Sequence, residues 1–431
     1  MEMRRPLLAF CLLFLASVAG TVESKAAPIT TRGAGAWSTA ASLITGRENQ
    51  SATLLRNGNL LVVGGMDGRG VPLASAELYN PRTNRWTAAG AMATTRLDHT
   101  ATLLANGKVL VAGGIRGSIP SDTLASTEIY DPASNRWSEA APMIDSRSRH
   151  TATLLGDGRV LVVGGFSVKI GERGLEVGQP GDAELYDPRT NRWSPTPPMA
   201  RYRREHTATL LSDGRVLVAG SQDDLTFNSA EIYDPAGNQW IAAAPMTSGR
   251  ALHSAVRLAN GEVLVVGGIS QGQNSPAIEL ASAEIYHPST NRWTAVASMT
   301  QARTRETTTL LGDGRVLVLG AGFARGRPEL YDPSRNRWSV VGPVAVRSGF
   351  TATRLQDGTA LVVGGYGAAL SSVLQYDPGA VARTPPQPID MRVVAAALLL
   401  ALAAVAWSIP AVRRRLQGLR PDPNAEEWIT S

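Results

Sequence analysis

Residues 146–165 read SRSRHTATLLGDGRVLVVGG, and near copies of this stretch occur six more times in the 431-residue chain. Its apolar runs TATLL and RVLVV are separated by Asp157-Gly158. Such a pair between apolar runs is a strong signal for a β-hairpin, because a tight type I′ turn needs positive φ at both central positions. The second run is continuously apolar from Val160 to Val163, which indicates a strand covered on both faces. Gly164-Gly165 then allows a sharp turn. We therefore predict that each copy is a buried hairpin.

Further signals repeat in register with this hairpin. A short run such as AELY follows the double glycine and ends on a Tyr that has Pro two residues later. Asn-Arg-Trp, or a close variant, then begins another strand. Each repeat of about 50 residues thus holds four strands, and seven repeats predict an all-β, seven-bladed β-propeller. The tryptophans that mark the fourth strands are Trp37, Trp86, Trp137, Trp193, Trp240, Trp293 and Trp338.

The ends of the repeat array are incomplete in a complementary way. Trp37 has no Tyr-x-Pro before it, and Tyr376 has no Trp after it. We therefore expect the strand around Trp37 to be the fourth strand of the last blade, whose first three strands come from residues 350–376. Pairing the two ends would leave no open sheet edge in the ring.

The double glycine, the Tyr-Asp-Pro and the Asn-Arg-Trp at these spacings resemble the repeats of kelch proteins, over roughly residues 35–378. The resemblance implies a kelch-type propeller domain, placed at residues 33–380, with a ligand face built from loops, as in the kelch domains of eukaryotic substrate adaptors. Two repeats depart from the pattern, because Ser221 follows Gly220 and Ala321 follows Gly320. We expect altered turns there and no lost blade.

The segments outside the repeats resemble those of a bacterial, membrane-anchored protein. A short basic start and an apolar run too short to span a bilayer indicate a signal peptide. Near the other end, twenty residues without charge precede three consecutive arginines, which predicts a single transmembrane helix with its basic end in the cytoplasm and the propeller on the extracytoplasmic side of the cell membrane. The expected segments are the signal peptide 1–26, a Pro-rich linker 381–392, the helix 393–412 and a cytoplasmic tail 413–431.

Composition excludes two classes of function. The net charge of +6 is spread along the chain with no basic cluster, so we expect no nucleic-acid partner. The repeats also resemble the kelch propeller of galactose oxidase-like proteins, whose copper-radical cofactor uses a tyrosine crosslinked to a cysteine. Cys11 is the single cysteine and would leave with the signal peptide. We therefore expect no copper-radical site, no other metal and no cofactor.

When the seven repeats are aligned, two columns of equivalent residues stand just before the first strand of each repeat. Their residue types could serve either in a chemical site or in packing. Three residues after an arginine stands a histidine in four repeats, and these histidines could form a metal site or cap and pack their strands. Metal ligands must lie about 2–2.2 Å from one ion, whereas different blades are spread around a ring, so packing is favoured. We expect each guanidinium to bond carbonyls of the neighbouring blade. The columns are Arg47, Arg96, Arg147, Arg203, Arg250, Arg303 and Arg347, then Gln50, His99, His150, His206, His253, Glu306 and Phe350.

A binding site would break the sevenfold repetition, so candidate ligand contacts are sought where the repeats differ. Two residues after each arginine the residue changes from blade to blade, and so do the residues after the double glycine. The resemblance places these positions on the ligand face. The candidate ligand-binding residues are Asn49, Asp98, Arg149, Glu205, Arg305, Arg116 and Tyr366.

No nucleophile–base pair or phosphate-binding loop is visible in the repeats, so no catalytic residue is assigned. The sequence favours a membrane-anchored module that binds a protein, peptide or glycan, with arginines and carboxylates orienting the ligand. The alternative is a kelch sugar mutarotase of the periplasmic type, which would need no metal. Whether the chain is an enzyme stays open at this point.

Overall fold

The computed structural model describes residues 35–117, 123–171, 174–178, 183–222, 227–270, 276–320, 326–342, 347–366 and 370–380, with the side chains of 169–177 left out. The expected signal peptide, linker, transmembrane helix and tail lie outside these residues. No helix in the described ranges is long and apolar enough to cross a membrane.

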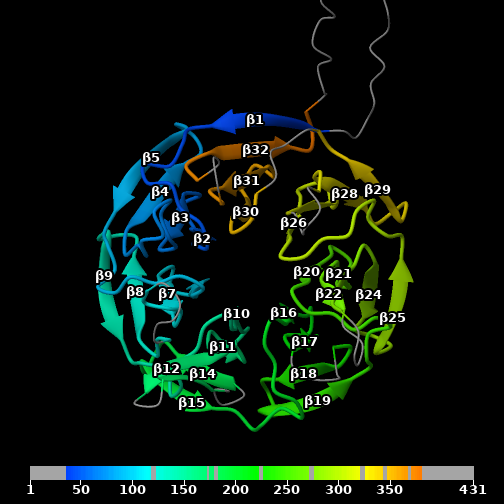
Figure 1. The fold of residues 1–431 in the computed structure, drawn as a ribbon, viewed down its shortest axis with the longest axis horizontal. Coiled ribbons are helices and arrows are strands. Elements are labelled where there is room, and N and C mark those ends of the chain that lie inside the picture. Colours follow the sequence, from blue (N-terminus) through cyan, green and yellow to red (C-terminus); the bar gives the residue numbers. More distant parts are fainter. Residues whose placement is uncertain are drawn as a thin grey trace, which may run out of the picture. The chain divides into compact units, whose positions relative to one another are not determined.

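Seven four-stranded antiparallel sheets surround a common axis, as the repeats predict (Figure 1). We number them as blades 1–7 in chain order and give their strands from the axis outward. The strands of blade 1 are β2 (Ser51–Leu54), β3 (Leu60–Val63), β4 (Ala76–Asn80) and β5 (Arg85–Ala89); of blade 2, β6 (Thr100–Leu103), β7 (Val109–Ala112), β8 (Thr127–Asp131) and β9 (Arg136–Ala140); and of blade 3, β10 (Thr151–Leu154), β11 (Val160–Val163), β14 (Ala183–Asp187) and β15 (Arg192–Pro195). Those of blade 4 are β16 (Thr207–Leu210), β17 (Val216–Ala219), β18 (Ala230–Asp234) and β19 (Gln239–Ala243), and those of blade 5 are β20 (Ser254–Arg257), β21 (Val263–Val266), β24 (Ala283–His287) and β25 (Arg292–Val296). Blade 6 contains β26 (Thr307–Leu310), β27 (Val316–Leu319), β28 (Glu329–Asp332) and β29 (Arg337–Val340), and blade 7 contains β30 (Thr351–Arg354), β31 (Ala360–Val363), β32 (Val373–Asp377) and β1 (Ala36–Ala40).

The first strand of the chain closes the ring. β1 pairs antiparallel with β32, and Trp37 stands opposite Tyr376 in the register. In Figure 1 this places the start of the propeller directly outside its last strand. The closure predicted from the two incomplete repeats is therefore present, and blade 7 has four strands like the others.

The inner hairpins differ from the predicted turn type. Leu155 N–H donates to Arg159 O at 2.8 Å and Gly158 N–H donates to Leu155 O at 3.1 Å, so three residues form the loop. Only Gly158 has a positive φ, at 89°, whereas Asp157 does not. The loop is a type I turn followed by a left-handed glycine, and the type I′ prediction is wrong. The Asp157 carboxylate accepts the Arg159 N–H and holds the turn.

The core lies between the blades. All four residues of β11, and of each equivalent second strand, are buried, as continuous apolarity predicts. Leu217 of blade 4 packs in one cluster with Val263 and Tyr286 of blade 5. Each seam between blades is therefore a separate hydrophobic core. Burying one such side chain in it contributes roughly 1.5–3 kcal/mol.

The outer rim is held by the Asn-Arg-Trp turns. Asn191 has a left-handed backbone with φ of 51°, and its amide oxygen accepts from Tyr186 OH at 3.0 Å and from the N–H of Ala141 in the preceding blade at 3.0 Å. The Trp193 indole donates to Ala141 O at 2.8 Å and packs on Tyr186 with ring centroids 5.0 Å apart. Each tryptophan turn thus joins two blades.

Two blades carry insertions after the double glycine, and in two others the second glycine is replaced by another residue. A hairpin of β12 (Ser167–Gly171) and β13 (Gly174–Gly178) extends from blade 3, and a shorter one of β22 (Ile269–Ser270) and β23 (Ile278–Glu279) extends from blade 5. Where the second glycine is replaced, both blades keep four strands. The turn does change in blade 6, where Gly320 has φ of 125°.

Candidate functional site

The arginine column is buried at the face that carries the double glycines and the Arg-x-x-His connections, which we call the loop face. Arg147 has no solvent exposure. Its Nη1 donates to Gly164 O at 2.9 Å and its Nη2 donates to Glu184 Oε1 at 2.6 Å. Both acceptors belong to blade 3, which Arg147 leads into. The expectation that the guanidinium bonds the neighbouring blade is therefore wrong, because the side chain folds back over its own sheet.

The carboxylate partner was missed from the sequence, although its signal was present in the AELY runs. Each of six blades has a glutamate in its third strand that pairs with the buried arginine. In blade 7 Leu374 takes this place, and Arg347 pairs with no carboxylate among the described residues. The pairs, at 2.5–2.8 Å, are Arg47–Glu77, Arg96–Glu128, Arg147–Glu184, Arg203–Glu231, Arg250–Glu284 and Arg303–Glu329.

The backbone of the same arginines joins neighbouring blades. Arg203 O accepts from the N–H of Gly165 in the preceding blade at 3.0 Å. A Cβ added to Gly164 would lie 2.2 Å from Arg203 O, so only glycine lets this carbonyl approach. The double glycine is thus explained by close contact between blades as well as by its positive φ angles of 58° and 94°.

The histidines pack between blades. His150 Nε2 lies 2.9 Å from the Thr100 hydroxyl on the innermost strand of the preceding blade, and the other three histidines make the same contact with Ser or Thr. Burial, reinforced by the nearby arginine, lowers the pKa of His99 and of His206 to about 3, so both are uncharged at neutral pH. No group of three or more His, Cys, Asp or Glu side chains in the described part of the chain is placed to hold a metal ion.

Glu306 takes the histidine position in blade 6 and makes no equivalent bond. Neither oxygen of its carboxyl has a hydrogen-bond partner within the described residues. The Ser254 hydroxyl, which stands where the other blades hold the histidine's partner, lies 2.8 Å from Thr308 Oγ1 instead. Burial raises the pKa of Glu306 to about 8, so the group is largely protonated at neutral pH.

The column that varies between blades has one backbone conformation throughout. Its seven residues all have φ between 50° and 63°, which is the left-handed region. Several of their N–H groups donate to the carbonyl of the same column in the preceding blade; Arg149 N–H, for example, donates to Asp98 O at 3.1 Å, and Arg305 N–H to Leu252 O at 2.9 Å. We call this set the axial column. It contains Asn49, Asp98, Arg149, Glu205, Leu252, Arg305 and Gly349.

Four side chains of the axial column form one charge network. Arg149 Nε donates to Asp98 Oδ2 at 2.9 Å and its Nη1 donates to Glu205 Oε1 at 2.9 Å. Arg305 Nη2 lies 3.7 Å from the same Glu205 oxygen. Burial lowers the pKa of Arg149, but the two carboxylates outweigh it and raise that pKa above its ordinary value. The guanidinium also lies 5.5 Å from the ring centroid of Phe166, a cation–π contact that was not foreseen.

The remaining candidates lie outside this network. The Asn49 N–H donates to Gly349 O at 2.8 Å, which continues the backbone ring between blades 7 and 1. Arg116 is exposed, and its carbonyl accepts from the Thr95 hydroxyl at 2.7 Å. Tyr366 is the most exposed large apolar side chain described, at 68%. The structure therefore brings together Asp98, Arg149, Glu205 and Arg305 only.

Comparison with known proteins agrees with this architecture. Models described as Kelch motif match residues 51–93, 98–144 and 250–300, and a second model with the same description matches residues 146–200. These matches fall on blades 1, 2, 3 and 5. The chain is a kelch-repeat propeller. Its other three blades have the same strands and the same buried arginines, so the kelch architecture extends around the whole ring.

Curated relatives share only part of their length with this kelch protein. Human Kelch-like protein 23 is 32% identical over 100 residues, which cover 23% of this chain and 16% of the relative. Human Kelch-like protein 33 is also 32% identical over 100 residues, covering 23% and 17%. Rat Kelch-like protein 7 is 33% identical over 82 residues, covering 19% and 12%. The chain thus matches less than a fifth of the length of these relatives.

Solved structures share the fold at low sequence identity. A fungal alcohol oxidase of the AA5 family, in complex with copper, superposes with a TM-score of 0.64 at 20% identity, covering 80% of this chain and 76% of that one. The structure of YjhT superposes with a TM-score of 0.54 at 16% identity, covering 71% of this chain and all of that one. These likenesses establish the propeller architecture and nothing about activity.

Proposed function

We propose that this kelch propeller is a binding module whose loop face takes a protein partner at the axial charge network. Kelch propellers are typical protein-interaction modules. The observation that carries the proposal is the chain of charges from Asp98 through Arg149 and Glu205 to Arg305, in a column whose residues do not repeat. A residue that repeats in every blade stabilises the propeller, whereas a charged residue at the loop face that does not repeat is available to bind a ligand.

The two arginines of the network have different roles in this proposal. Arg149 is 28% exposed and is held on both sides by carboxylates, so it is fixed in position before binding. Arg305 is 52% exposed, and its nearest carboxylate is beyond hydrogen-bond distance. Arg305 would therefore pair with a carboxylate of the partner, and charge-assisted arginine–carboxylate bonds are among the stronger polar contacts at interfaces.

Anchoring and topology belong to the same proposal. Residues 393–412 carry no charge and precede Arg413, Arg414 and Arg415, which favours one transmembrane helix with the propeller outside the cytoplasm. In spheroplasts, added protease should digest the propeller while an epitope placed after Ser431 stays intact. Digestion of the epitope with protection of the propeller would reverse the orientation.

The binding site is tested on the tagged full-length protein, crosslinked to its neighbours in the native membrane. Arg149→Ala and Arg305→Ala should each reduce recovery of the crosslinked partners at least about tenfold, equivalent to about 1.4 kcal/mol. Arg189→Ala is the matched control, because Arg189 is 72% exposed and pairs only with Asp187 in its own turn. Equal recovery from all three variants would rule out the axial network as the binding site.

The glycan and mutarotase alternatives are separated in the same preparations. A glycan ligand would be retained by a glycan array with the same dependence on Arg149. Acceleration of sugar anomerisation that is lost in Glu205→Ala would instead favour the mutarotase. Neither result is expected if the partner is a protein.

A further inference from the structure

A second site is indicated at the opposite ends of the inner strands, on the face that carries the Asp-Gly and Asp-Pro turns, which we call the turn face. In some blades the residue after the inner turn is an arginine that bridges to the next blade. Arg159 Nε donates to Asp157 Oδ2 at 2.7 Å, and its Nη2 donates to Pro235 O of the next blade at 3.3 Å. The guanidinium therefore fills the seam between two blades.

The seam between blades 6 and 7 repeats this arrangement. Arg315 Nε donates to Asp313 Oδ2 at 2.7 Å, and Nη2 donates to Pro378 O at 3.0 Å. Two independent seams thus show which groups accept a guanidinium here. They are a turn carboxylate from one blade and the carbonyl of an Asp-Pro or equivalent turn from the next.

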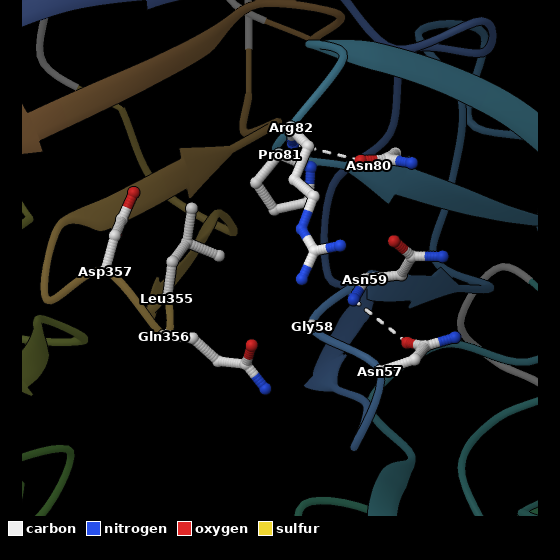
Figure 2. Close-up of a pocket in the computed structure, with 9 residues that line it drawn as sticks. All are labelled: Asn57, Gly58, Asn59, Asn80, Pro81, Arg82, Leu355, Gln356 and Asp357. Atoms are coloured by element: carbon white, nitrogen blue, oxygen red, sulfur yellow. Dashed lines mark hydrogen bonds between the residues drawn. The ribbon is translucent and has the colours of Figure 1, made fainter.

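The seam between blades 7 and 1 has the acceptors without the arginine. Thr359 occupies the arginine position, and its hydroxyl donates to Asp357 Oδ1 at 2.7 Å within its own turn. The seam holds a hollow of about 300 Å³ between the turns of the two blades (Figure 2). Its lining residues are Asn57, Gly58, Asn59, Asn80, Pro81, Arg82, Leu355, Gln356 and Asp357.

A second hollow supports the link between the missing arginine and the open seam. Between blades 5 and 6 the arginine position is Glu262, which lies 2.6 Å from His287 Nδ1, and a hollow of about 340 Å³ opens there, lined by Asn260 and Pro333 among others. The turn of blade 5 carries Asn260 in place of the aspartate. Of these two hollows, only the one between blades 7 and 1 has an aspartate in the inner turn of the preceding blade, whereas the other is lined by Asp313 and Asp332 of the following blade.

We propose that the hollow between blades 7 and 1 binds the guanidinium of an arginine side chain presented by a partner protein. Asp357 would supply the carboxylate and Pro81 the carbonyl, as Asp157 and Pro235 do for Arg159. A guanidinium is matched to this pair because its donors form a planar fork. The site lies at the far end of the inner strands from the axial network and does not depend on the proposed function of that network.

Arg82 bears on the strength of this site. It is exposed and lines the hollow, and Figure 2 shows its guanidinium on the side of Asn59, away from Asp357. A bound guanidinium would meet this like charge across the hollow. Removing the charge should therefore strengthen binding, and raising the salt concentration should weaken the effect of Arg82.

The test uses the full-length protein in detergent with Nα-acetyl-arginine methylamide as the probe, observed by saturation-transfer NMR. The citrulline analogue, which has the same shape and no charge, should bind at least about tenfold more weakly. Thr359→Arg rebuilds the filled seam and should abolish probe binding while raising the melting temperature. Asp357→Asn should weaken binding at least about fivefold, and Arg82→Ala should tighten it.

A reciprocal variant guards against an effect of misfolding. Arg159→Thr empties the seam between blades 3 and 4 and should create a second binding site for the probe, at the cost of a lower melting temperature. Binding that persists in Thr359→Arg, or equal binding of the arginine and citrulline probes, would overturn the proposal. Variants of Arg149 should leave probe binding unchanged, so failure of this site and failure of the axial site are distinguishable.

Discussion

Two columns of this propeller share a left-handed backbone and a contact between neighbouring blades, but they differ in whether their residue repeats. The outer column stands two residues before the tryptophan of each outer strand and is asparagine in blades 1–6 and Gly35 in blade 7. The axial column stands at the loop face and carries a different residue in almost every blade. The outer asparagines are Asn84, Asn135, Asn191, Asn238, Asn291 and Asn336.

The difference lies in which atoms make the contact between blades. In the outer column the side chain does so, because the amide oxygen of Asn191 accepts from Ala141 N–H of the preceding blade. In the axial column the backbone does so, because Arg149 N–H donates to Asp98 O. The fold therefore fixes the outer side chain and leaves the axial one free. Asparagine also tolerates positive φ, whereas arginine, glutamate and leucine are strained there, by an amount on the order of 1–3 kcal/mol.

The largest effect is expected where a repeated side chain is buried and charged. Glu184→Ala would leave Arg147 without its carboxylate, and breaking a buried ion pair costs about 3–5 kcal/mol. Chemical denaturation of the full-length protein should show this loss. Arg189→Ala, which removes the exposed partner of Asp187, should leave the free energy of unfolding nearly unchanged. If both variants lost the same free energy of unfolding, the buried ion pair would contribute no more to stability than the exposed one.

A pH-dependent effect is expected from Glu306, the residue that departs from a repeated column. Its pKa is raised from 4.5 to about 8 by burial, so the folded state binds the proton more tightly than the unfolded state does. The contribution of Glu306 to the free energy of unfolding, taken as the difference between the wild type and Glu306→Gln, should be largest below pH 4.5 and fall as pH rises towards 8, by about 1.4 kcal/mol per pH unit. Denaturation midpoints measured across this window provide the check.

Glu306→Gln should remove that slope. Glu306→His should restore the contact to Ser254 that the other histidines make with their neighbouring hydroxyl, and its contribution should fall as pH drops below 6.5, because burial lowers the pKa of the equivalent histidines to about 3. A slope that is unchanged in Glu306→Gln would assign the pH dependence to another group.

A smaller effect is expected in the axial column itself. Leu252 has φ of 55°, which strains a leucine and suits a glycine. Leu252→Gly should therefore be more stable than Leu252→Ala by about 1 kcal/mol, although both remove the same side chain. Differential scanning calorimetry of the two variants measures this. An alanine variant that is the more stable of the two would mean that the left-handed backbone there is not strained.

Much of the fold could be predicted because its columns repeat. The inner hairpins, the blade count and the closure by the strand around Trp37 follow from residues that recur or are missing at fixed spacing. The turn type was wrong, since one left-handed glycine at Gly158 suffices when the loop has three residues. The buried glutamates were missed because Glu184 reads as the polar face of a strand until its position is compared across repeats.

The site could be predicted only as a set of positions. Asp98, Arg149 and Glu205 are about 50 residues apart in the sequence, and only the curvature of the ring brings their side chains within hydrogen-bond distance. The sequence contains no signal for the contact of Arg149 with Phe166. The hollow between blades 7 and 1 was also missed, because Thr359 is informative only beside the arginines that fill two of the other seams.

The most direct test of the account compares Asn191→Gly with Arg149→Gly in the full-length protein, because glycine accepts the left-handed backbone at both positions. Asn191→Gly should lower the free energy of unfolding by about 1–3 kcal/mol, through loss of its two hydrogen bonds, and keep partner recovery. Arg149→Gly should change stability by less than about 1 kcal/mol and abolish partner recovery. If Arg149→Gly unfolded the propeller, or if its partner recovery were intact, the axial column would be scaffold and the proposed binding site would be refuted.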